Sequence, residues 1–288
     1  MTRYILMVFV GACSYGILST FVKLSYREGY TASEIAVSQA LTGMIVLWLI
    51  VLVSKQFPGR KHSLKSLLLL LPTGAAIGFS SFVYYLSVIY LPASIAIVIL
   101  MQFTWLGLLL EWVFFKQRPN SIQLITTCMI LVGSCLASGG ISAATHLPWQ
   151  GIGLAALSAL LYAIYLLANG RVGKDIPSLP KSAIMMTGSF VGLLIANFPQ
   201  LLASQHTNIG LVKWALFLAT FGTILPPLLF SKGIPKIGVG VSAILMTAEL
   251  PVAIICSHML LQEPVTILQW SGVGVMLFAL VLLNIRSK

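Results

Sequence analysis

Apolar runs of about twenty residues recur along the whole of this 288-residue chain. A helix needs about 20 mostly apolar residues to cross the hydrocarbon of a bilayer, and only helices or closed barrels satisfy the backbone there. These runs do not alternate in polarity as barrel strands do. The chain is 58% hydrophobic and 8% charged, whereas a soluble domain is roughly 25% charged. The sequence therefore predicts an all-α integral membrane protein in which lipid is the main solvent.

We expect ten transmembrane helices, because ten runs are long and apolar enough. They cover residues 4–24, 34–53, 64–85, 93–115, 122–138, 151–169, 183–203, 211–230, 239–261 and 268–285.

The basic residues predict the orientation, since loops rich in Lys and Arg stay in the cytoplasm. With the N-terminus inside, only Lys23, Arg27 and Lys213 of the 17 lysines and arginines lie on the far side. Both termini are therefore predicted to be cytoplasmic. The net charge is +11, and the basic residues responsible for it lie in short loops between apolar runs. Their expected partners are anionic lipid headgroups. No nucleic acid is expected.

An internal repeat is visible when the chain is shifted against itself by about 146 residues. Gln123 then falls on Gln269, and Trp105 falls on Pro251. We interpret this as a duplication, with repeats at residues 1–142 and 148–288. Each repeat has five runs, and an odd number forces the second to enter the membrane from the opposite side. Inverted repeats of this kind are common in secondary transporters.

Three motifs in the second half resemble a known family. Ala248–Val252, Leu260–Pro264 and Gln269–Gly272 are similar to the pattern of the EamA-like branch of the drug/metabolite transporter superfamily. The first half departs from that pattern at Trp105 and Gln117. The resemblance implies two EamA repeats and the movement of amino acids, other metabolites or drugs, often outward.

Glu249 is the principal candidate for a substrate or proton site, because an ionisable group within a span usually faces a cavity or a partner. Pro251 cannot donate its backbone hydrogen bond, which is expected to free the carbonyl of Thr247. A carboxyl beside loosened backbone is suited to a cation, a proton or a substrate amine. The alternative is a neutral Glu249 bonded to a neighbouring helix.

The other candidates are amphipathic or polar side chains, each with a structural alternative. Packing or an interfacial belt is the alternative for the aromatic residues, and an interfacial or structural position is the alternative for Lys23 and His258. Glu111 is expected to pair with Lys116 one turn away. A kink or hinge is expected at Pro226, Pro227 and Pro251. The full set of substrate or proton candidates besides Glu249 is Lys23, Gln102, Trp105, Tyr15, Tyr84, Tyr162, Tyr165 and His258.

Nucleotide-binding, metal and hydrolase motifs are missing from the sequence. The four cysteines fall in apolar runs, so no metal, cofactor or catalytic role is expected. We therefore expect a secondary transporter, not an enzyme, in the bacterial cytoplasmic (inner) membrane, exporting a small solute by alternating access. The expected partners are that solute, membrane lipids and a coupling proton, and the chain is expected as a monomer or a homodimer. A membrane-embedded enzyme acting on a lipid-soluble substrate and a non-transporting scaffold remain as alternatives.

Overall fold

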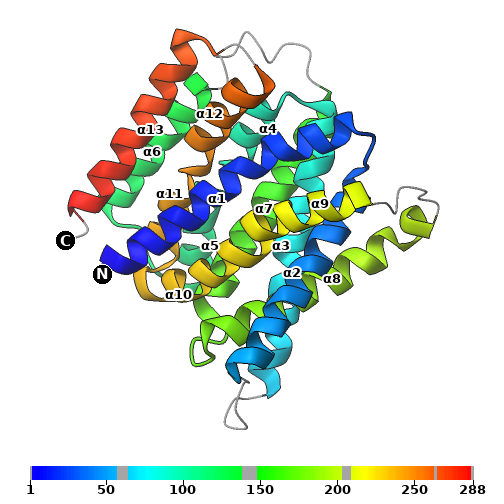
Figure 1. The fold of residues 1–288 in the computed structure, drawn as a ribbon. Helices are drawn as coiled ribbons and strands as arrows, with labels where there is room; N and C mark the ends of the chain where they lie inside the picture. The colour runs from blue at the N-terminus through cyan, green and yellow to red at the C-terminus, as the bar shows by residue number, and fades with distance from the viewer. Residues whose placement is uncertain (1, 57–63, 138–147, 203–208, 263–264, 287–288) are drawn as a thin grey trace.

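The computed structural model describes residues 2–56, 64–137, 148–202, 209–262 and 265–286, and the regular structure within these ranges is helical (Figure 1). The helices are α1 (Thr2–Arg27), α2 (Ala32–Ser54), α3 (Leu64–Tyr90), α4 (Ala93–Leu100), α5 (Phe103–Phe115), α6 (Ser121–Ala137), α7 (Trp149–Arg171), α8 (Ser178–Leu202), α9 (Ile209–Leu218), η2 (Ala219–Ile224), α10 (Leu225–Ile237), α11 (Val239–Met246), α12 (Glu249–Leu261) and α13 (Ile267–Arg286).

Among the described residues, eight helical stretches are long and apolar enough to cross a membrane, and α6 and α13 are shorter apolar helices. Each predicted run falls on one helix or on consecutive helices, so the helical fold class is confirmed. Large apolar side chains such as Val53, Ile195 and Ile267 are exposed on the outside, as contact with lipid requires. Ten crossings and cytoplasmic termini remain predictions. The expected boundary between the repeats, at residues 142–148, lies mostly outside the described residues.

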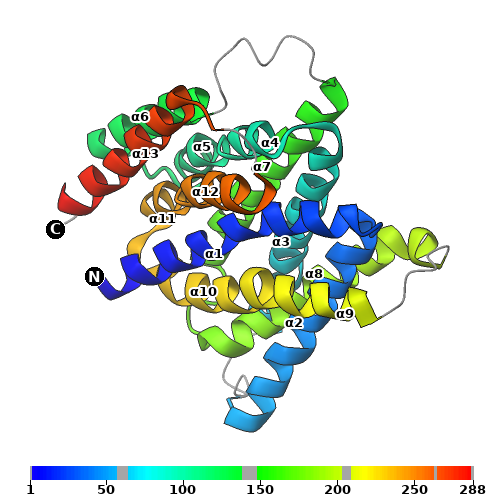
Figure 2. The same cartoon turned by 45° about the horizontal axis from the view of Figure 1, so that its top comes forward.

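The helices of the two halves are interleaved. The helix α3 packs along α7 and α8, while α10 packs along α1, and α9 and η2 pack on α2. At one edge of the molecule α6 and α13 lie side by side (Figures 1 and 2). Each half therefore buries its inner face mainly against the other half.

Two predicted spans are broken in the middle. The break between α4 and α5 is at Met101 and Gln102, and the break between α11 and α12 is at Thr247 and Ala248. The two breaks stand at the 146-residue shift that the sequence suggested. Pro251 explains the second break in part, because it cannot donate to the Thr247 carbonyl. That carbonyl is nevertheless not free, which corrects our expectation: it accepts from the amide of Leu250 at 3.1 Å.

A π-helical turn interrupts the predicted eighth span. The turn η2 precedes Pro226 and Pro227, and the amide of Leu225 bonds to the Thr220 carbonyl five residues back. Because the two prolines supply no amide donors, the carbonyls one turn earlier cannot keep the α-helical pattern. The prolines and the π turn therefore coincide.

Lys181 lies in α8 rather than in the expected cytoplasmic loop. The helix begins at Ser178, five residues before the predicted span, and carries Lys181 into the bundle. Its side chain is only 1% exposed, and its Nζ donates to the Asn169 carbonyl at 2.7 Å. The earlier helix start is the physical reason for this correction.

Glycines bring α3 and α8 into close contact. A Cβ added at Gly74 would lie 1.6 Å from the Met185 carbonyl oxygen, and one at Gly188 would lie 2.0 Å from the Leu71 carbonyl oxygen. Lipid gives little hydrophobic driving force between helices, so close packing of small residues stabilises such contacts. Gly74 and Gly188 therefore determine how closely α3 and α8 pack.

We predict that Gly188→Ala lowers the free energy of unfolding by about 1–3 kcal/mol, because overpacking costs about that much. Gly153→Ala is the control, since a Cβ there meets nothing within 4 Å. Thermal unfolding of the purified variants in detergent measures both. Equal stabilities for the two variants would contradict the close contact of α3 with α8.

Candidate functional site

A small cavity lies between the two halves. Residues of α1, α3 and α4 from the first half and of α7 and α12 from the second line it. Its volume is about 40 Å³, which is room for about three waters at about 10–15 Å³ each. Pockets that take drug-sized ligands measure about 300–1,000 Å³. In this conformation the cavity is therefore far smaller than a site for a drug-sized solute.

Among the described residues that line the cavity, Glu249 is the one carboxyl. It is the first residue of α12, directly after the break, and it is 4% exposed. Its Oε1 accepts a hydrogen bond from the Tyr162 hydroxyl. A buried ionisable group in a membrane protein needs a partner. Beside the Tyr162 hydroxyl, this carboxyl is suited to bind a proton, a cation or an amine.

A glycine allows α1 to approach Glu249. A Cβ at Gly16 would lie 2.5 Å from the Glu249 carbonyl oxygen and 2.7 Å from the Cβ of Val252. Only a residue without a side chain permits this distance between α1 and α12. The sequence analysis did not single out Gly16, because nothing along the chain marks which helix it faces.

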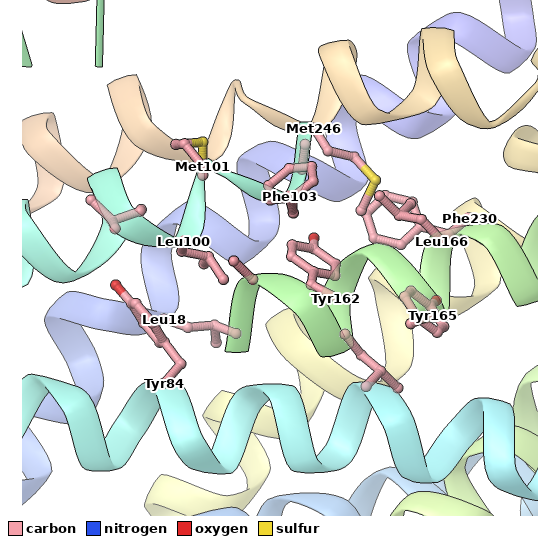
Figure 3. Close-up of a cluster of buried hydrophobic side chains, with 14 of the residues drawn as sticks. Leu18, Tyr84, Leu100, Met101, Phe103, Tyr162, Tyr165, Leu166, Phe230 and Met246 are labelled. Carbon is pink, nitrogen blue, oxygen red and sulfur yellow. The ribbon is translucent and has the colours of Figure 1, made fainter. Parts of the chain in front are cut away.

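Aromatic rings surround the Tyr162 side chain. The ring of Phe103 lies 4.6 Å from it and that of Tyr15 lies 6.2 Å from it, between centroids. Figure 3 shows Tyr162 pointing from α7 toward the break that precedes Phe103. Phe103 stands 146 residues before Glu249, so the two breaks present an apolar ring and a carboxyl to the same tyrosine. The site is thus chemically asymmetric.

Three of the four tyrosines proposed from sequence line the cavity. They are Tyr15, Tyr84 and Tyr162. Tyr165 is stacked behind Tyr162 at 6.3 Å and accepts a hydrogen bond from Asn169 at 3.2 Å. It supports the cavity wall rather than forming it.

The cavity also has small polar groups that the sequence analysis missed. Ser80 and Ser158 each donate to the other's backbone carbonyl, at 2.9 and 2.8 Å, and so join α3 to α7. Tyr85 donates to Gln39 Oε1 at 3.0 Å. Serines are common in apolar helices, so only the packing of the helices distinguishes these from others.

The remaining sequence candidates lie away from the cavity. Trp105 is 40% exposed and donates to Gln102 Oε1 at 2.9 Å, so this pair bonds to itself on the outside of α5. Lys23 is half-buried on α1, and the exposed His258 ring lies 6.4 Å from that of Trp270. Gln102 and Trp105 are not among the described residues that line the cavity, because Leu100 and Phe103 occupy the inward face at this break. Their role as substrate candidates stays a prediction.

An ion pair joins the two halves near the C-terminal ends of α5 and α7. Arg171 lies 3.0 Å from Glu111 and donates to Gln117 at 2.6 Å. Its guanidinium also stands 4.2 Å above the Phe115 ring. The ion pair of Glu111 is thus with α7, not with Lys116 on its own helix as expected. The planar guanidinium of Arg171 has several N–H donors, which lets it make these contacts together.

A known protein family matches this chain in two segments, one in each half. The sequence profile of the EamA-like transporter family matches residues 2–139 and 149–285. The chain belongs to the EamA-like transporter family. This family is part of the drug/metabolite transporter superfamily, so the resemblance seen in the sequence is confirmed. This EamA-like chain is accordingly a multi-pass membrane protein of a transporter family.

One curated protein and one solved structure are similar to this chain. A protein of Synechocystis sp. named an uncharacterized transporter is 27% identical over 222 residues, covering 72% of this EamA-like chain and 64% of the relative. The match thus spans less than two thirds of the relative's length. A solved structure titled only "Crystal structure of protein" has a TM-score of 0.76 at 12% identity, covering 100% of this chain and 98% of that one. At that identity the likeness shows the fold alone.

We predict that Tyr162→Phe lowers the free energy of unfolding by about 1–3 kcal/mol, because it removes the hydroxyl that donates to the buried Glu249. Tyr15→Phe is the control, since it removes a hydroxyl from the same cavity and leaves this bond in place. Denaturant unfolding in mixed micelles measures the difference. The hydrogen bond contributes nothing if both variants unfold alike.

Proposed function

We propose that this EamA-like protein is a secondary transporter that exports a small metabolite, amino acid or drug-like solute across the bacterial cytoplasmic membrane by alternating access. In this proposal ten helices form two inverted repeats, residues 1–142 and 148–288, with both termini in the cytoplasm. Glu249 binds the solute or a coupling proton.

The observation that carries the proposal is the position of Glu249. The carboxyl lies at the start of a half-helix, in the wall of a cavity to which both halves contribute. Discontinuous helices whose ends face a central site are typical of secondary transporters. An ionisable side chain deep in a membrane protein is also costly unless it has a function or a partner. Tyr162 is one hydrogen-bond partner of Glu249. In this proposal the cavity admits the solute or proton as a second partner.

The chemistry of the cavity indicates the class of solute. Aromatic and aliphatic side chains form most of the wall, with serines and tyrosine hydroxyls between them and Glu249 as the charged group. Such a wall favours a solute with an apolar body and an amine that pairs with the carboxylate. Amino acids and cationic drugs both fit that description. A proton on Glu249 would compete with the amine, which couples export of the solute to proton entry.

The ion pair of Arg171 with Glu111 supports a rocking motion. It joins α7 of the second half to α5 of the first, so the two halves can separate at this end only if the pair breaks. The pair is accessible to water at the side chains' edges and is therefore of modest strength. A contact of that kind can close one end of the cavity and still open.

We predict that Glu249→Gln lowers transport at least about tenfold, because a charge-assisted contact of a bound amine is worth about one factor of ten or more. The measurement is counterflow of radiolabelled amino acids and fluorescent cationic drugs in liposomes that contain the purified protein. Asp175→Asn is the matched control, since that exposed carboxyl lies in the connection between α7 and α8.

Three results would contradict the proposal. One is the absence of transport by the wild type across a broad panel of solutes. Another is unchanged transport with unchanged pH dependence in Glu249→Gln. The third is an equal loss in Asp175→Asn, which would trace the effect to charge in general rather than to this site.

A further inference from the structure

A second and larger cavity opens at one end of the bundle, remote from Glu249. Its volume is about 660 Å³. The start of α1, the connection between α7 and α8, and the C-terminal part of α10 converge on it, with the end of α2 on one side. The predicted orientation places this end at the cytoplasmic surface. No residue of this cavity takes part in the proposed solute site.

Four cations line this second cavity. They are Arg3, Lys174, Lys232 and Lys236, and the described lining residues include no carboxylate. Lys232 and Lys236 are four apart on α10 and so share one face of that helix. Asp175 adjoins Lys174 in the chain but is not part of the lining. The described lining is therefore positive on the sides that α1, the α7–α8 connection and α10 supply, and it attracts anions.

One helix start adds to this positive potential. Ser178 and Leu179 are in the first turn of α8. The amides of a first turn have no partner within their own helix and carry partial positive charge. Such ends bind phosphate and other anions. Here this start reinforces four side-chain cations rather than acting alone.

Part of the cavity lining is apolar. Met7, Ile50 and Leu228 belong to it, from α1, α2 and α10 respectively. Cations together with aliphatic side chains in one lining match an amphiphile that has an anionic head and an apolar part. A small inorganic anion would leave the apolar wall without a contact. The volume is within the range of about 300–1,000 Å³ that is usual for small-molecule sites.

We propose that this second cavity binds a phosphate-bearing amphiphile, with the phosphate among the four cations and the apolar part along Met7, Ile50 and Leu228. A phosphate group offers several acceptor oxygens and so bonds to more than one lysine or arginine together. Two sources share this chemistry, the headgroup of an anionic phospholipid and a soluble phosphate ester. The site does not depend on solute transport through the Glu249 cavity.

The test is native mass spectrometry of the full-length protein in detergent, titrated with phosphatidylglycerol, with phosphatidylcholine or with glycerol phosphate. We expect preferential binding of a phosphate anion that weakens at least about tenfold in the double variant Lys232→Gln/Lys236→Gln, because two charge-assisted contacts are lost. The control Lys213→Gln removes an exposed lysine of α9 and should bind like the wild type. Arginine at both positions 232 and 236 should restore binding.

The arms of the titration distinguish the source. Retention of phosphatidylglycerol without glycerol phosphate identifies a lipid headgroup, whereas retention of both identifies a phosphate ester as sufficient. Equal binding of phosphatidylglycerol and phosphatidylcholine, with no glycerol phosphate bound, would overturn the site. Equal losses in the double variant and in Lys213→Gln would also overturn it, since the effect would then follow net charge alone.

Discussion

The hydrogen bond from Tyr162 to Glu249 connects the two features on which the rest of the structure depends, a broken helix and a buried carboxyl. In lipid, an interrupted helix is tolerated only where protein or water satisfies the backbone. The break between α11 and α12 meets that condition locally, because the amides of Ala248 and Leu250 donate to the Leu245 and Thr247 carbonyls. Around it, Gly16 lets α1 approach, and α7 supplies the tyrosine that bonds to the Glu249 side chain. The position of Glu249 therefore requires the interleaved packing of both halves, and the cavity follows from that packing.

The site is asymmetric although the helices around it are related in pairs. The two breaks stand 146 residues apart, yet one presents Phe103 and the other Glu249 to the same ring. With an apolar residue at one break, Glu249 is the one carboxyl among the described residues that line the cavity, and the proposed mechanism has solute and proton share it. At the end of the bundle, Arg171 and Glu111 hold α7 to α5. In the proposed mechanism, opening at this end and binding at Glu249 both involve α7.

Much of the fold was predictable from the sequence, because hydrophobic length alone determines where helices lie in lipid. Of the two breaks, one was predictable in part. Pro251 indicated irregular backbone near Thr247, whereas Trp105, at the equivalent position of the first half, gave no signal for the break at Met101. The site was predictable where the residue type was itself unusual, as with Glu249. Ser80, Ser158 and Gly16 could not be found, since their roles arise from contacts between distant helices. Lys181 was misplaced because a basic residue near a predicted boundary does not show that the helix starts earlier.

The central claim is that the cavity beside Glu249 opens in turn to each side of the membrane. The most direct test is the labelling of Ser81→Cys, a position that lines the cavity, in a variant whose four native cysteines are replaced. A membrane-impermeant thiol reagent is added to right-side-out and to inverted vesicles. The account predicts labelling from both sides. Labelling from one side alone, or from neither, would contradict it.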